Sequence, residues 1–140
     1  MIDARIERRL LQATVMAGCL VSIGAGMAGI VSGGAFLKGV AAPVPVDLDS
    51  HFRYLSGLLL GIGIAFAACV PAIERRTALF GTLGGIVIVG GLARLSSILL
   101  AGMPSGGHQF GLAMELGAIP LLILWQRRIA RRCAQAANEG

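Results

Sequence analysis

Four long apolar segments constrain this chain more than any other feature of its sequence. They cover about residues 10–34, 52–71, 77–100 and 108–126. A helix needs about 20 apolar residues to cross a bilayer core of roughly 30 Å. Within hydrocarbon every backbone N–H and C=O group must be paired inside the protein, and a helix pairs them within the segment itself. The segments therefore predict an all-α integral membrane protein with four transmembrane helices.

Composition agrees with this class and leaves little sequence for anything else. The chain has 140 residues, of which 56% are hydrophobic and only 14% are charged, and its mean hydropathy is +0.81. Short connections between the segments predict antiparallel neighbours in an up-down-up-down bundle. We expect residues 1–140 to form a single transmembrane domain that ends in a basic tail, 127–140.

The arginines predict the orientation of the bundle. Two basic residues, Lys38 and Arg53, lie on one side of the expected membrane, and Arg94 lies within a segment. Positive residues on short loops mark the cytoplasmic side, so we expect a multi-pass membrane protein with both termini in the cytoplasm. The high pI expresses the same asymmetry, and a modest affinity of the basic tail for anionic lipid headgroups accounts for it without nucleic-acid binding. Nine arginines lie on the cytoplasmic side: Arg5, Arg8, Arg9, Arg75, Arg76, Arg127, Arg128, Arg131 and Arg132.

The first connection, 38–50, contains Pro43 and Pro45, which remove backbone donors and favour an extended loop. Asp49 or Ser50 is expected to cap the second helix by accepting hydrogen bonds from its first N–H groups.

Glycine indicates how the helices pack. Small residues spaced four apart let helix backbones approach closely within a membrane. Such faces serve either packing within the chain or contact with a second copy or another membrane protein, and the sequence does not choose between these. The faces are Gly18-Ser22-Gly26, Ala25-Gly29-Gly33, Gly57-Gly61-Ala65-Cys69 and Gly81-Gly85.

Arg94 and Glu115 each lie alone inside an apolar segment. An ionised side chain there costs about 2.5–3.5 kcal/mol on insertion scales, so such residues are usually buried, paired and functional. Arg94 lies seven residues before Ala101 and Glu115 seven residues after His108, on either side of one outer turn. We expect the two side chains to pair. Pro120, which removes the hydrogen bond to the Leu116 carbonyl, predicts a kink just inward of Glu115.

Further polar residues are expected in the outer half of the bundle. In the inner half, the spans contain no ionisable residue other than Cys69. A through-going channel needs polar groups across the whole depth, so a blind pocket that opens outward fits the pattern better. The pair is either a structural ion pair or part of a ligand site. The candidate residues are Arg94, Glu115, Arg53, His51, His108 and Ser97.

Neither metal binding nor catalysis has a motif here. His51 and His108 with a carboxylate are suitable ligand types, but they lack diagnostic spacing. Ser56, Ser96 and Ser97 lack a recognisable nucleophile motif. We therefore expect no metal, no cofactor and no catalytic residues.

Three polar stretches resemble a family of small bacterial four-span membrane proteins that is catalogued only as a domain of unknown function. They are residues 50–57 (SHFRYLSG), residues 90–95 (GGLARL) and Glu115-Leu116. The similarity extends from the first segment to Trp125. It implies a four-helix integral membrane protein and carries no activity, cofactor or catalytic residue.

These observations, together with the resemblance, favour a non-enzymatic multi-pass protein of a bacterial inner membrane. It would act either as an accessory or scaffold subunit or as a binder of a small amphiphile in the outward pocket. A homo-oligomeric transporter or exporter subunit is the alternative, and an intramembrane enzyme is a more distant third.

Overall fold

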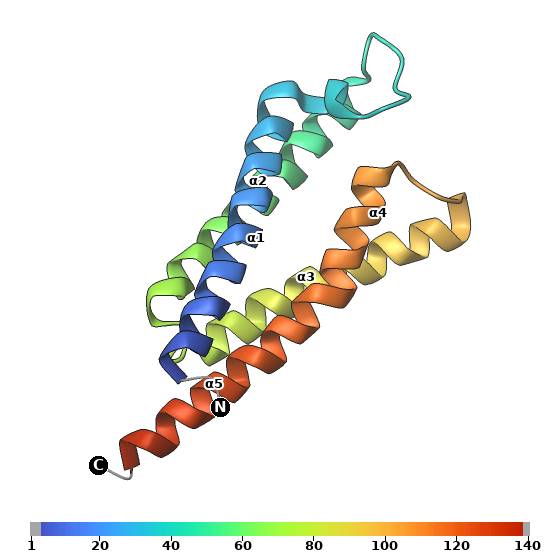
Figure 1. Cartoon of the computed structure of the whole chain (residues 1–140). Helices are drawn as coiled ribbons and strands as arrows, with labels where there is room; N and C mark the ends of the chain where they lie inside the picture. Colours follow the sequence, from blue (N-terminus) through green and yellow to red (C-terminus); the bar gives the residue numbers. More distant parts are fainter. Residues whose placement is uncertain (1–3, 139–140) are drawn as a thin grey trace. The chain divides into compact units, whose positions relative to one another are not determined.

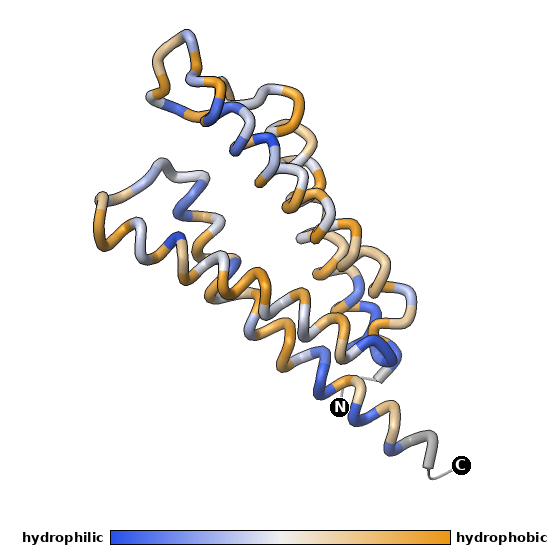
Figure 2. Tube along the Cα trace, turned by 180° about the vertical axis from the view of Figure 1, so that it is seen from behind, coloured by the Kyte–Doolittle hydropathy of each residue, from blue (hydrophilic) through white to orange (hydrophobic). Residues whose placement is uncertain are grey.

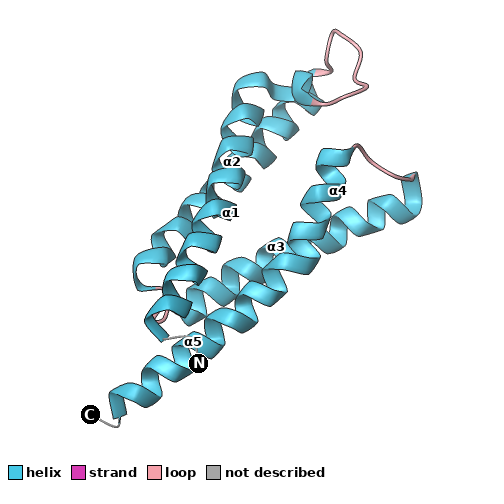
Figure 3. Ribbon diagram, in the orientation of Figure 1, coloured by secondary structure: helices cyan, strands magenta, loops and turns pink. Residues whose placement is uncertain are grey.

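The computed structural model describes residues 4–138, and this part of the chain is helical apart from short loops and turns (Figure 3). It contains no strand in that range, which confirms the all-α prediction. The long elements are α1 (Ala4–Ser32), α2 (Val46–Cys69), α3 (Thr77–Ala101), α4 (Gly106–Ala113) and α5 (Ile119–Asn138). The short ones are two 3-10 turns, η1 (Gly33–Phe36) and η2 (Val70–Ala72), and a π-helical turn, η3 (Met114–Ala118).

Four helical stretches are long and apolar enough to cross a membrane, which confirms that prediction by length and composition. The fourth joins α4, η3 and α5 into one span. Their apolar side chains are widely exposed, as expected of surfaces that face lipid. The stretches are Arg5–Phe36, Val46–Ala72, Thr77–Ala101 and Gly106–Gln135.

The second helix begins earlier than predicted. The Asp49 N–H donates to the Pro45 carbonyl at 3.0 Å, so the first turn of α2 is already closed there. The predicted cap at Asp49 or Ser50 is therefore wrong, and the start near residue 52 is corrected to Val46. At the other end of the chain, α5 carries the predicted basic tail as helix through Asn138. Residues 1–3 and 139–140 of the predicted 1–140 domain lie outside the described residues.

The first helix ends at Ser32, a boundary that the sequence left open. Gly33 has φ of 56°, in the left-handed region that glycine enters without steric cost, and the 3-10 turn η1 follows it.

The chain divides into two compact units, coloured blue to green and mainly yellow to red in Figure 1. We call Thr14–Ala68 the hairpin unit, and Met1–Ala13 with Cys69–Gly140 the carboxy-terminal unit. A single bundle that contains both units stays a prediction.

Glycines hold the two helices of the hairpin unit in close contact. A Cβ added at Gly26 would lie 2.8 Å from the backbone N of Leu60 and 2.8 Å from the backbone O of Ser56. Gly57 and Gly61 have no such neighbour within 4 Å. Only some of the predicted small-residue faces therefore contribute to packing within the chain.

The carboxy-terminal unit buries its largest side chains at the end where α3 begins. Leu11 and Ile73 are fully buried there, and Phe80 is nearly so. The buried amide of Gln126 donates to the Ile73 carbonyl at 2.7 Å and to Thr77 Oγ1 at 2.9 Å. This end is thus a small core that joins three segments of the chain.

On α3 the closest glycine contacts are at Gly84 and Gly91, which meet Ile123 and Leu116. Of the Gly81-Gly85 face singled out in the sequence, a Cβ added at Gly81 would lie 3.8 Å from Nη2 of Arg127, whereas Gly85 has no neighbour within 4 Å.

Candidate functional site: the Arg94–Glu115 ion pair

Arg94 and Glu115 form a two-point ion pair within the carboxy-terminal unit. Nε of Arg94 donates to Oε2 of Glu115 at 3.0 Å, and Nη2 donates to Oε1 at 3.0 Å. The planar guanidinium matches a carboxylate in this geometry, and such charge-assisted pairs are the strongest hydrogen bonds between side chains. The Arg94 side chain is 32% exposed and that of Glu115 is 20% exposed. The two charges are thus neutralised yet remain partly accessible.

Glycine brings the two helices close enough for this pair to form. A Cβ added at Gly91 would lie 2.8 Å from Cβ of Glu115 and 2.8 Å from Cδ2 of Leu116. On the opposite helix, a Cβ added at Gly111 would lie 3.7 Å from Cζ of Arg94. Glycines on both helices therefore leave room for the guanidinium and the carboxylate to meet.

Glu115 lies on the π-helical turn η3, where the helix departs from its regular hydrogen bonding. The Ile119 N–H donates to the Met114 carbonyl, five residues earlier, and Pro120 follows with no N–H to donate. The ribbon bends where α4 joins α5, the bend expected near Pro120 (Figure 1). Single π-turns within helices are frequent at functional sites. The candidate site thus combines an ion pair in a span with an irregular helical turn.

The pair lies inside the candidate spans rather than at their ends. Arg94 precedes the end of α3 at Ala101 by seven residues, which corresponds to about 10 Å along a helix. Both Thr77–Ala101 and Gly106–Gln135 are long and apolar enough to cross a membrane, so both charges lie within candidate spans.

Two other predicted residues of this unit lie apart from the ion-paired atoms. Ser97 is exposed and makes no hydrogen bond with the described residues through its side chain. Nδ1 of His108 lies 3.0 Å from Oγ of Ser105, a local contact at the start of α4. Neither contacts the ion pair through a hydrogen bond.

The remaining two predicted residues, Arg53 and His51, belong to the hairpin unit. Arg53 Nε donates to Oδ2 of Asp49 at 2.7 Å, and its Nη1 donates to the carbonyls of Ile30 and Val31. The backbone N–H of Gly34 donates to Oδ1 of Asp49 at 2.8 Å. Arg53 therefore supports the carboxy-terminal end of α1, and His51 is exposed. The i,i+4 spacing of Asp49 and Arg53 was the available signal for this pair.

One family model matches most of the chain. It describes a domain of unknown function, DUF4345, and covers residues 10–126. The chain belongs to this family. The match confirms the family resemblance noted in the sequence and includes both members of the Arg94–Glu115 pair. No curated protein and no solved structure matches the chain.

This DUF4345 protein has a second ionic cluster that the sequence did not predict. Glu7 is 8% exposed, and its carboxylate accepts from Arg132 Nη1 at 2.6 Å and lies 3.5 Å from Nε of Arg128. Nearby, Arg8 Nη1 lies 3.4 Å from Oε1 of Glu74. The sequence indicated only a basic loop surface here, because Glu7 and Arg132 are 125 residues apart.

Metal-binding geometry has no support in the described residues, where no group of three or more His, Cys, Asp or Glu side chains comes together. His51 and His108 lie in different units.

Proposed function

We propose that this DUF4345 chain is a non-enzymatic multi-pass protein of a bacterial inner membrane, with both termini in the cytoplasm. In this proposal it binds a small amphiphile at the Arg94–Glu115 pair. The observation that carries the proposal is the two-point pair on η3, inside two candidate spans and still partly exposed. A pair that served only to join two helices would gain from complete enclosure, since water and lipid then could not compete for it.

The hydrogen-bonding capacity of the pair indicates what kind of headgroup would fit. Nε and Nη2 of Arg94 are used by Glu115, whereas Nη1 makes no hydrogen bond with the described part of the chain. A guanidinium nitrogen can only donate. The ligand would therefore present an acceptor, such as a phosphate, carboxylate or carbonyl oxygen.

The surroundings favour a ligand with an apolar body. Leu92 and Leu99 on α3 and Phe110 on α4 are each more than half exposed. Within a bilayer these side chains would contact acyl chains or the tail of a ligand. In this proposal the headgroup binds Arg94 and the tail lies against the apolar surface of the same two spans.

Non-enzymatic binding fits the side chains better than catalysis does. Oγ of Ser96 donates to the Ala93 carbonyl at 2.7 Å and is occupied by its own helix. The Ser105–His108 contact lacks a carboxylate that orients the imidazole within the described residues, so the nucleophile–base–orienter arrangement is incomplete.

The test is the set of molecules that co-purify with the full chain. We expect mass spectrometry of extracts from the wild type to show one amphiphile at near-stoichiometric amount. Arg94→Gln should lower that amount by about tenfold, since a charge-assisted hydrogen bond contributes roughly 1.5–3 kcal/mol. The double variant Arg94→Gln/Glu115→Gln, which leaves no unpaired charge, should lose the ligand while it stays folded.

Arg53→Gln is the matched control, because it removes an arginine paired with a carboxylate in the other unit. It should retain the amphiphile. Equal amounts of every co-purifying lipid in all four proteins would contradict the proposal and leave the pair as a structural element.

A homo-oligomeric transporter or exporter subunit is the second candidate, and η3 with Pro120 is the observation that favours it. A π-turn followed by proline is a local irregularity at which α4 can reorient relative to α5. Flux of a substrate through proteoliposomes that depends on Glu115 would favour this candidate over static binding.

A further inference from the structure

The positive charge of the carboxy-terminal unit is concentrated at the end that carries the termini. Nine arginines lie there against two described carboxylates, Glu7 and Glu74. By contrast, Arg94 and Glu115 cancel each other, and Lys38 and Arg53 are balanced by Asp47 and Asp49 in the hairpin region. Figure 2 shows hydrophilic residues gathered near both termini, on the first turns of α1 and the last turns of α5.

Three of these arginines line one hollow. The hollow has a volume of about 190 Å³, and its walls are Arg5, Arg8 and Arg9 of α1 with Cys133 of α5. Residues 5, 8 and 9 share one helix face because they are three and four positions apart. Arginine binds phosphate through paired N–H donors, so three guanidinium groups around one small space match the chemistry of a phosphate.

Neighbouring ion pairs hold the two helices that line this hollow together. Glu7, on a different face of α1, binds Arg128 and Arg132 of α5 and so fixes the two helices together. The contact between Arg8 and Glu74 uses one nitrogen at 3.4 Å, and the buried Nε of Arg8 has no acceptor in the described part of the chain. Glu74 therefore engages Nη1 of Arg8 and not Nη2.

An exposed apolar row runs beside the arginines. Ile6 is 53% exposed and Leu10 is 49% exposed, and each directly follows Arg5 or Arg9 in the sequence. Neighbouring positions on a helix point about 100° apart, so the row Ile6–Leu10 lies next to the row Arg5–Arg9. A free phosphate would use only the arginines, whereas a phospholipid would use both rows.

We propose that Arg5, Arg8 and Arg9 form a binding site for the phosphate of an anionic phospholipid, with its acyl chain along Ile6 and Leu10. This site is separate from Arg94, which follows the start of α3 by 17 residues, or about 25 Å along the helix. It depends on membrane insertion and not on what the Arg94–Glu115 pair binds. The arginine count places it at the cytoplasmic leaflet, where anionic lipids are enriched.

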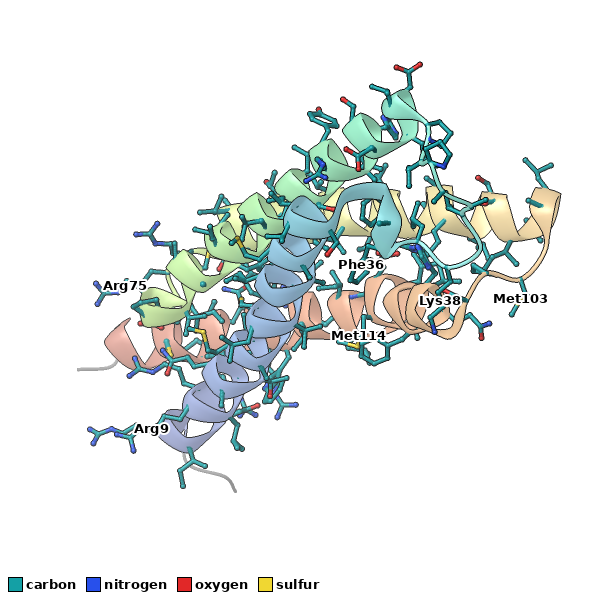
Figure 4. The ribbon with its side chains drawn as sticks, turned by 90° about the horizontal axis from the view of Figure 1, so that it is seen from above. Arg9, Phe36, Lys38, Arg75, Met103 and Met114 are labelled. Carbon is teal, nitrogen blue, oxygen red and sulfur yellow. The ribbon has the colours of Figure 1, made fainter. Side chains whose placement is uncertain are left out.

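The test compares two variants of equal charge in the full chain. Arg5→Gln/Arg9→Gln removes two walls of the hollow and leaves Arg8 with Glu74. Arg75→Gln/Arg76→Gln removes two arginines from the same unit that do not line the hollow; Figure 4 shows Arg9 and Arg75 both extending away from the ribbon. Phosphatidylglycerol and phosphatidylcholine with identical acyl chains are titrated into the purified protein, and bound lipid is measured by native mass spectrometry.

The wild type should bind phosphatidylglycerol at least fivefold more tightly than phosphatidylcholine. A basic residue near an anionic surface strengthens binding roughly fivefold. Arg5→Gln/Arg9→Gln should therefore weaken the binding of phosphatidylglycerol by tenfold or more. Arg75→Gln/Arg76→Gln should weaken it by no more than about twofold, since these positions act only through the screened long-range field. Arg5→Lys/Arg9→Lys, which keeps the charge and loses the planar fork, should fall between them and replaces the glutamine variant if that one does not fold.

Equal losses in the two glutamine doubles would overturn the site, because net charge alone would then explain the binding. Equal affinity for the two lipids would overturn it as well. Displacement of phosphatidylglycerol by millimolar inorganic phosphate, with tighter binding of the free ion, would overturn the assignment to a lipid.

Discussion

Arg53 of the hairpin unit and Arg94 of the carboxy-terminal unit each pair with a carboxylate close to a helix contact lined by glycine, but the two arginines have different roles. In the hairpin unit, Arg53 pairs with Asp49 on its own helix and donates to carbonyls at the end of α1. In the carboxy-terminal unit, Arg94 pairs with Glu115 across helices, 21 residues along the chain and inside two spans. The first pair supports the carboxy-terminal end of α1, and the second joins two helices within candidate membrane spans.

The comparison shows that the position of a charge pair determines how much it contributes to stability. Near a loop, water competes for Arg53 and Asp49, whose side chains are 44% and 33% exposed. Exposed i,i+4 pairs contribute little to stability. Within a span, the alternative to pairing is an ionised group in hydrocarbon, so the Arg94–Glu115 pair is costly to break. The two pairs therefore predict different responses to the same chemical change.

Breaking the Arg94–Glu115 pair on one side should have the largest effect. Either Glu115→Gln or Arg94→Gln leaves an uncompensated charge in a span, and we expect a loss of about 2–3 kcal/mol in the free energy of unfolding. The double variant should lose about half as much, because no charge remains unpaired. The measurement is unfolding of the purified protein in mixed micelles, followed by far-ultraviolet circular dichroism. Additive losses in the double variant would show that the pair is not coupled.

Adding a methyl group at Gly26 should have the next largest effect. The new Cβ would approach two backbone atoms, the N of Leu60 and the O of Ser56, and backbone cannot move aside without separating the helices. We expect Gly26→Ala to cost about 2 kcal/mol relative to Gly24→Ala. Gly24 has no such neighbour within 4 Å, so Gly24→Ala gains the same helix propensity without the clash. Equal stability of the two alanine variants would mean that α1 and α2 are not in this close contact.

The helices themselves could be predicted from the sequence, because apolar length and the need to pair backbone groups act locally. The pairing of Arg94 with Glu115 could also be expected, since a lone charge in a span needs a partner and only one carboxylate lies at a matching depth. Both conclusions rest on large free-energy costs, of an unpaired backbone group and of an unpaired charge in a span, that can be recognised from the sequence.

Other features depend on contacts that the sequence does not bring together. The start of α2 differs from the prediction because Asp49 accepts from Gly34, which lies on the other side of the loop, and so is not used as a cap. The network of Glu7 depends on Arg132, 125 residues away. The bend at Pro120 could be predicted from a missing N–H, but the π-turn η3 and the close approach of its Glu115 and Leu116 to Gly91 could not.

Adding a methyl group at Gly91 should have a smaller effect than at Gly26. Here the new Cβ would meet side-chain atoms of Glu115 and Leu116, which can shift by small rotations. We expect Gly91→Ala to cost about 1 kcal/mol relative to Gly90→Ala, a neighbour with open space around it. The same unfolding experiment measures it. A cost as large as that of Gly26→Ala would show that α3 and η3 are as rigidly apposed as α1 and α2.

Removing Arg53 should have the smallest effect of the four, which is the sharpest contrast with Arg94. Arg53→Gln loses the contacts to Asp49, Ile30 and Val31, but water near the loop can replace the donors at those exposed carbonyls. We expect a shift of the unfolding transition smaller than that of Gly91→Ala. The shift should shrink further in high salt, because the Debye length falls to about 3 Å at 1 M ionic strength and screens exposed pairs first. The shift caused by Arg94→Gln should change much less with salt, because its partner is shielded by helices and lipid. If salt affected both variants equally, position within the span would not distinguish the two pairs.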